Sequence, residues 1–193
     1  MNAKRIAIFA SGSGSNTQSI IEYFQQKESI EVALIMCNKS NAFVVQRAKN
    51  LGVKCFVFNS DTFKNNLGFL DILSKYKVSW IVLAGFLLKI PEYVIEQYQG
   101  KIINIHPALL PKYGGKGMYG ANVHKAVLEN KELQSGISIH YVNKNYDEGK
   151  IIFQASCSIS PEDSLEDLSN KIQQLEHLHY PRVIEETIIN SDK

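Results

Sequence analysis

The sequence predicts an α/β fold with a doubly wound, mostly parallel sheet, antiparallel strands near the C-terminus and a long final helix. Over the first hundred residues, short apolar runs alternate with amphipathic segments, a repeat typical of parallel sheets with right-handed crossovers. The apolar runs are continuous, as in strands that helices cover on both faces. After Pro111 the repeat stops, and two alternating runs precede one long apolar stripe.

In the first half, the pattern predicts five strands and four helices. The predicted strands span residues 5–10, 32–37, 54–58, 80–84 and 101–105, and the predicted helices span residues 16–26, 42–51, 62–76 and 91–98. Ser15 or Asn16 can cap the first helix, and Gly52 can end the second. Pro91 fits the first turn of the fourth helix.

In the second half, residues 112–120 carry four glycines in nine positions, which indicates a mobile loop. A helix is predicted at 121–129, and strands at 136–142 and 150–157 form a candidate antiparallel pair. A long helix opens at 160–163, where Asp163 and Glu166 have the spacing of a capping box.

The composition is that of one globular domain spanning residues 1–193, with 45% hydrophobic and 21% charged residues. A formal net charge of +2, without a dense Lys/Arg run, argues against a nucleic-acid partner. We find no signal peptide and no run long enough for a membrane span. The three cysteines are odd in number and far apart, so we expect them to be reduced and mostly buried, in a cytoplasmic protein.

The most informative stretch is Asn104-Ile105-His106-Pro107-Ala108-Leu109-Leu110-Pro111, directly after the fifth predicted strand. Side chains two apart on a strand face the same way, so an amide and an imidazole project together from the strand's end. Ligands of open α/β sheets bind at this edge. Asn104 and His106 therefore suit a site that stabilises negative charge on a carbonyl oxygen, although a His-Pro pair can also be purely structural.

A glycine-serine loop, Ala10-Ser11-Gly12-Ser13-Gly14-Ser15-Asn16, joins the first strand to the first helix. A helix start after such a loop favours an anion. The third glycine of a dinucleotide motif would fall at Thr17, and residues 36–39 lack the expected carboxylate, so we favour a single phosphate over NAD. A structural turn without a ligand is the alternative.

Asp147 lies in a turn that ends at Gly149. From such a turn a carboxylate could meet a histidine of another strand and raise the pKa of its imidazole, but Asp before Gly is most often only a turn residue. His140 alternates with apolar neighbours and could be a strand histidine without function. By themselves, His124 and Glu176 are expected to be exposed. No histidine or cysteine spacing indicates a metal site.

These residues together resemble the phosphoribosylglycinamide formyltransferase family of folate-dependent enzymes, over nearly the whole chain. The motifs that carry the resemblance are Ser11-Gly12-Ser13-Gly14-Ser15-Asn16, Leu83-Ala84-Gly85-Phe86, Asn104-Ile105-His106-Pro107-Ala108-Leu109-Leu110-Pro111 and Tyr146-Asp147-Glu148-Gly149. The resemblance implies a Rossmann-like formyltransferase fold, with a phosphoribosyl-binding half at 1–100 and a catalytic and folate-binding half at 101–193. It also implies transfer of a formyl group from 10-formyltetrahydrofolate, as co-substrate, to the amine of phosphoribosylglycinamide in purine biosynthesis.

The resemblance also implies site residues. Asn104, His106 and Asp147 match the family's catalytic trio, in which Asn104 and protonated His106 stabilise an oxyanion and Asp147 supports the charged imidazole. The residues matching the ribonucleotide site are Gly14, Ser15, Asn16, Thr17, Gln18 and Glu176. Those matching the folate site are Leu87, Leu88, Lys89, Ile90, Asn104 and His140.

Formyltetrahydrofolate hydrolase and a non-catalytic phosphoribosyl- or nucleotide-binding module are the alternatives. The hydrolase carries an additional N-terminal regulatory domain, and a binding module has no need of the trio, so we expect the transferase. We expect small-molecule substrates only, no metal or NAD, no nucleic acid or membrane, and a monomer or homodimer.

Overall fold

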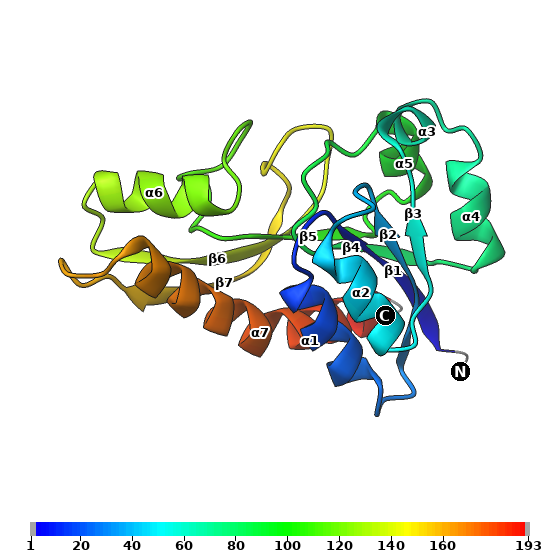
Figure 1. Ribbon diagram of the computed structural model, residues 1–193, viewed down its shortest axis with the longest axis horizontal. Coiled ribbons are helices and arrows are strands. Elements are labelled where there is room, and N and C mark those ends of the chain that lie inside the picture. Colours follow the sequence, from blue (N-terminus) through cyan, green and yellow to red (C-terminus); the bar gives the residue numbers. More distant parts are fainter. Residues whose placement is uncertain (1–2, 192–193) are drawn as a thin grey trace.

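The computed structural model describes residues 3–191, which form a three-layer α/β structure around one seven-stranded sheet (Figure 1). The strand order is β3-β2-β1-β4-β5-β6-β7. Neighbouring strands from β3 to β5 pair in parallel, whereas β6 pairs antiparallel with both β5 and β7. This confirms the predicted fold class. The strands are β1 (Lys4–Ala10), β2 (Ile30–Cys37), β3 (Cys55–Val57), β4 (Trp80–Leu83), β5 (Ile102–His106), β6 (Gln134–Tyr141) and β7 (Ile151–Ser158).

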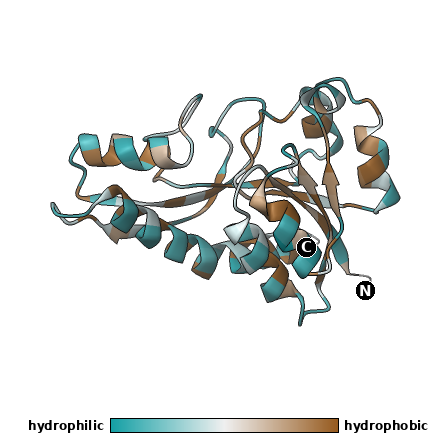
Figure 2. Cartoon of the chain, viewed as in Figure 1, coloured by the Kyte–Doolittle hydropathy of each residue, from teal (hydrophilic) through white to brown (hydrophobic). Residues whose placement is uncertain are grey.

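Helices cover the sheet on both faces, and the hydrophobic sides of the helices turn toward it (Figures 1 and 2). The helices are α1 (Ser15–Phe24), α2 (Phe43–Asn50), α3 (Ser60–Lys64), α4 (Phe69–Lys75), α5 (Glu92–Gln97), α6 (Ala121–Glu129) and α7 (Leu165–Asn190). In β1, Ile6 and Ile8 belong to the same buried cluster as side chains of α1, α2 and α7, whereas Ala7 and Phe9 belong to the cluster that contains side chains of α3, α4 and α5. Successive side chains of a strand face opposite layers, which explains its continuous apolar run.

One predicted helix is wrong: residues 62–76 form two helices, α3 and α4, rather than one. Between them Asn66 and Gly68 adopt positive φ angles of 51° and 75°, a left-handed conformation that ends a right-handed helix. The side chain of Asn66 accepts a hydrogen bond from Leu70 N–H at 3.1 Å, inside the first turn of α4. The helical periodicity of the segment gave no sign of this break.

The cap of α7 lies one residue later than predicted. Ser164 Oγ accepts from Asp167 N–H at 3.1 Å, and Asp167 Oδ2 accepts from Ser164 N–H at 2.9 Å, which completes a capping box. Asp163 instead accepts from Ser160 N–H at 2.9 Å and pairs with Lys171. Within residues 3–191, no helix is long and apolar enough to cross a membrane.

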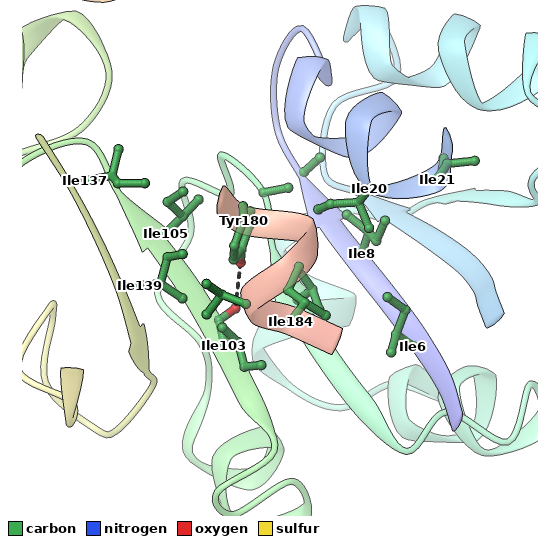
Figure 3. Close-up of a cluster of buried hydrophobic side chains, with 14 of the residues drawn as sticks. Ile6, Ile8, Ile20, Ile21, Ile103, Ile105, Ile137, Ile139, Tyr180 and Ile184 are labelled. Atoms are coloured by element: carbon green, nitrogen blue, oxygen red, sulfur yellow. Dashed lines mark hydrogen bonds between the residues drawn. The ribbon is translucent and has the colours of Figure 1, made fainter. Parts of the chain in front are cut away.

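The core beneath the carboxyl ends of β4 and β5 contains one buried tyrosine hydroxyl. Tyr180 of α7 is fully buried, and its hydroxyl donates to the carbonyls of Leu83 at 2.9 Å and Ile103 at 3.2 Å. Figure 3 shows its ring among isoleucine side chains from both β5 and β6. This contact fixes α7 against the two strands whose ends open toward the site.

The chain order reverses across β1, because β2 lies on one side of it and β4 on the other. At such a point the loops that follow neighbouring strands diverge and leave a crevice at their carboxyl ends. The loops after β1, β4 and β5 therefore meet at one edge of the sheet.

Candidate active site

A cavity of about 740 Å³ lies at this edge of the sheet. Its wall combines the glycine-serine loop, the segment after β4, the end of β5, the glycine-rich loop before α6, the turn before β7 and one face of α7. Twelve of the predicted site residues lie in this wall: Gly14, Ser15, Asn16, Leu87, Leu88, Lys89, Ile90, Asn104, His106, His140, Asp147 and Glu176. Segments far apart in the sequence thus form one site.

The glycine-serine loop presents the start of α1 to the cavity. Gly14 is the N-cap residue with φ 78°, and a Cβ there would lie 2.6 Å from Cγ2 of Val44. Only glycine fits both the left-handed backbone and this close approach of α2. The first turn of α1 contains no acidic residue, so its free N–H groups and positive dipole end can receive an anion.

Two side chains of α7 contact this loop. Asn16 Nδ2 donates to Glu176 Oε2 at 2.9 Å, and Gln173 Nε2 donates to Ser15 Oγ at 3.2 Å. Burial raises the pKa of the Glu176 carboxyl to about 7, although the hydrogen bond from Asn16 lowers it. Glu176 is therefore a wall residue of the cavity, not the solvated surface residue that its helix alone predicts.

Asn104 and His140 face each other across the antiparallel pair of β5 and β6. Asn104 Nδ2 lies 3.0 Å from His140 Nε2, and His140 Nδ1 lies 2.8 Å from the Tyr141 carbonyl. A carbonyl can only accept, so Nδ1 carries the hydrogen, and in the neutral ring Nε2 accepts from Asn104. His140 thereby orients the amide of Asn104 within the cavity wall.

His106 is almost fully buried and is held by the loop that follows it. Its Nε2 lies 2.7 Å from the carbonyl of Tyr113, so this nitrogen carries a hydrogen and donates it. Nδ1 then faces Oδ2 of Asp147 at 3.6 Å. A second proton on this ring would therefore go to Nδ1, on the side of the carboxylate.

Asp147 joins the two histidines. Its Oδ2 accepts from Gly115 N–H at 2.9 Å, and its Oδ1 lies 3.7 Å from His140 Nε2. Burial raises the pKa of the carboxyl, but the neighbouring histidines and Gly115 N–H outweigh burial and bring it below its ordinary value. Asp147 is therefore ionised at neutral pH, beside His106.

The expected pKa of His106 needs a correction. Asp147 does raise the pKa of His106, as predicted, and so does the Tyr113 carbonyl, but burial lowers it by more, and the net pKa lies below the ordinary value. Desolvation penalises the charged imidazole, and at 3.6 Å the carboxylate does not fully compensate. At neutral pH the free protein therefore holds mainly neutral His106, whereas the charged form that the resemblance implies belongs to the oxyanion intermediate.

The segment after β4 forms the opposite wall. Leu87, Leu88, Lys89 and Ile90 all line the cavity, and the main chain here is neither helix nor strand. The N–H of Leu87 donates to Ser11 Oγ at 2.9 Å. Among residues 3–191, the N–H groups of Leu88, Lys89 and Ile90 have no hydrogen-bond acceptor, so they can bind a flat heterocycle that carries acceptors.

Two predicted ligands do not reach the cavity wall. Thr17 is fully buried, and its hydroxyl has no hydrogen-bond partner among residues 3–191. The Gln18 side chain donates to Glu22 at 2.7 Å and accepts from Arg47. Both belong to the first turns of α1, but the structure turns their side chains away from the cavity.

The cavity wall also contains residues that the sequence analysis did not assign to the site, among them His124 and Gln173. His124 was expected to be exposed but is 6% exposed, because α6 packs it against the site. Gln173 precedes Glu176 by three residues, and this spacing on one helix face could have indicated it. The burial of His124 depends on the path of the glycine-rich loop, for which the sequence has no local signal.

The chain matches the family model described as formyl transferase over residues 4–184. It is 35% identical over 190 residues to phosphoribosylglycinamide formyltransferase of Bacillus subtilis, covering 96% of this chain and 95% of that protein. It is 37% identical to the chloroplastic phosphoribosylglycinamide formyltransferase of Arabidopsis thaliana, covering 94% of this chain but only 64% of the relative.

The chloroplastic phosphoribosylglycinamide formyltransferase of Vigna unguiculata is covered to 60% of its length, so the chain spans less than two thirds of these two plant proteins. Among solved structures, phosphoribosylglycinamide formyltransferase from Anaplasma phagocytophilum superposes with a TM-score of 0.88 at 29% identity, covering 100% of this chain and 89% of that one. The enzyme of the same name from Bacillus halodurans superposes with a TM-score of 0.87 at 34% identity, covering 95% and 94%. These comparisons confirm the resemblance drawn from the motifs, and the chain belongs to the formyl transferase family.

Proposed function

We propose that this chain transfers the formyl group of 10-formyltetrahydrofolate to the amine of N1-(5-phosphoribosyl)glycinamide, a step of purine biosynthesis. One observation carries the proposal: an anion-binding helix start and the trio Asn104, His106 and Asp147 line the same cavity. The names of relatives that match along nearly their whole length support this activity.

The phosphate of the ribonucleotide belongs at the start of α1. Gly14, Ser15 and Asn16 offer main-chain N–H groups and the helix dipole, and Glu176 and Gln173 stand beside them as polar partners for the sugar. Thr17 and Gln18 can contribute through the backbone of the same turn. The glycinamide amine then points along the cavity toward Asn104.

The formyl carbon is attacked by this amine between Asn104 and His106. A C–N bond forms as the carbonyl electron pair moves to oxygen. The pair then returns to re-form the C=O bond, and the bond to the folate nitrogen breaks as that nitrogen gains the proton lost by the amine. Asn104 donates a hydrogen bond to the oxyanion, the type of contact that lowers such barriers most. A water molecule can carry the proton between the two nitrogens.

His106 changes its charge as the oxyanion forms. Negative charge near the ring favours the imidazolium, and ionised Asp147 already faces Nδ1, where the proton would go. In the free protein, Nε2–H donates to the carbonyl of Tyr113. In this proposal neutral His106 takes up the proton that the attacking amine loses, relayed by water, and passes it on to the folate nitrogen as the intermediate collapses.

The pterin belongs against the segment from Leu87 to Ile90, with His140 near the reacting end. The N–H of Leu87 is already bound to Ser11, so only its carbonyl remains for the folate. We place the protein in the cytoplasm, supported by its three free cysteines, as a monomer or homodimer that acts on small molecules only.

Absorbance during turnover tests the proposal and separates it from its alternatives. A formyl-dideazafolate analogue is mixed with the protein, with and without the ribonucleotide. Deformylation that requires the ribonucleotide is the expected result. Deformylation without it would indicate a hydrolase, and none under either condition would indicate a binding module.

A further inference from the structure

The buried hydroxyl of Ser11 connects the glycine-serine loop to the segment after β4, and both segments contribute to the cavity wall. Ser11 is the first residue after β1 and belongs to the glycine-serine loop; it is 2% exposed and, unlike the following residues 12–16, does not line the cavity. Its Oγ accepts from Leu87 N–H at 2.9 Å, and its own N–H donates to the Gly85 carbonyl at 3.1 Å. Ser11, directly after β1, thus binds both Gly85 and Leu87 of the segment after β4.

The hydroxyl is oriented by a third segment. Ser11 Oγ donates its hydrogen to Oδ1 of Asn38, at the end of β2, over 2.6 Å. Because a serine hydroxyl has one hydrogen, this bond directs its lone pairs toward the N–H of Leu87. Asn38, Ser11 and Leu87 therefore form a chain of hydrogen bonds across the carboxyl ends of β2, β1 and β4.

The segment after β4 needs such a support because it has no regular structure of its own. Residues 84–90 lie outside helices and strands. Ala84 N–H donates to the Phe9 carbonyl at 2.8 Å. The two hydrogen bonds of Ser11 then fix the backbone at Gly85 and at Leu87. Groups that recognise a ligand through the backbone lose affinity when that backbone shifts by a fraction of an ångström.

We propose that Ser11 is a positioning residue for the folate co-substrate: it fixes the backbone from Gly85 to Leu87 and so presents residues 87–90 to the pterin. The proposal rests on the proposed function. It distinguishes Ser11 from the next residues of the loop, which serve the ribonucleotide.

The test is steady-state kinetics of Ser11→Ala, with Ser135→Ala as the matched control. Ser135 is also 2% exposed, but its hydroxyl has no partner among the described residues and it lies outside the cavity wall. We expect Ser11→Ala to raise KM for the formyl-folate analogue on the order of 10-fold. KM for the ribonucleotide should stay near the wild-type value, and Ser135→Ala should change neither.

A second pair of variants keeps the test decisive if Ser11→Ala does not fold. Asn38→Ala removes the acceptor that orients the hydroxyl, whereas Asn38→Asp retains an acceptor oxygen, so only the alanine variant should raise KM for the folate analogue. The inference is overturned if Ser11→Ala leaves KM for the folate analogue unchanged. If Ser11→Ala does not fold, the same result in Asn38→Ala overturns it. An equal rise in KM for the folate analogue and for the ribonucleotide overturns it as well. A wild-type protein without ribonucleotide-dependent turnover would overturn the proposed function instead.

Discussion

Glu176 is a carboxylate that destabilises the folded protein at neutral pH, so replacing it with glutamine should stabilise the fold. Burial raises the pKa of Glu176 from 4.5 to about 7 in the folded state. Between these values the folded protein binds more protons than the unfolded chain, so the free energy of unfolding falls as pH rises through this window. At about 1.4 kcal/mol per pH unit, the full separation corresponds to about 3 kcal/mol, as an upper bound.

Urea unfolding at pH 4.5 and pH 8, followed by the fluorescence of buried Trp80, measures this effect. Glu176→Gln retains an oxygen that can accept from Asn16. It should be close to wild-type stability at pH 4.5 and more stable by about 1–3 kcal/mol at pH 8.

Glu129→Gln, at a side chain 65% exposed on α6, is the control and should leave the wild-type pH dependence unchanged. A stability difference between Glu176→Gln and wild type that is the same at both pH values would show that folding does not raise the pKa of Glu176. A less stable variant at pH 8 would contradict the predicted stabilisation. The same variant should bind the ribonucleotide more weakly, since the site loses its carboxylate, and this trade of stability for binding is common at functional sites.

Three other substitutions probe the site and its support. Gly14→Ala should cost about 1–3 kcal/mol in urea unfolding, because its Cβ would meet Val44 at 2.6 Å in a left-handed backbone; wild-type stability would contradict this. Asp147→Asn should lower turnover on the order of 100-fold while calorimetry shows near-normal ribonucleotide binding, and the opposite pattern would remove its supporting role. Tyr180→Phe should lose about 1–2 kcal/mol of stability, more than Tyr98→Phe, whose single bond to a carbonyl is 3.3 Å long; the reverse order in urea unfolding would contradict the anchoring role of Tyr180.

The parts of the site that local sequence rules describe were predictable. Asn104 and His106 follow from strand alternation and from the prolines that end the strand, and Gly14 follows from the demands of a strand-to-helix turn. Parallel topology then brings both to one edge of the sheet. The same β-α rhythm predicted a doubly wound parallel sheet, whereas the order of its strands came from the structure.

Contacts between distant segments were not predictable from the residues alone. Glu176 meets Asn16 across 160 positions, and on α7 by itself it has the pattern of a surface residue. The neutral state of His106 depends on the balance between burial and a carboxylate 3.6 Å away, which no motif encodes. The break at Asn66 depends on two left-handed residues, whose conformation propensity alone does not determine.

The most direct test of formyl transfer is mass spectrometry of the ribonucleotide after incubation with 10-formyltetrahydrofolate and catalytic amounts of the protein. We expect one formyl group on the glycinamide amine for each folate deformylated, and a rate lower on the order of 100-fold or more in Asn104→Ala, which lacks the oxyanion donor. Folate deformylated without a formylated ribonucleotide, or a wild-type rate in Asn104→Ala, would contradict it.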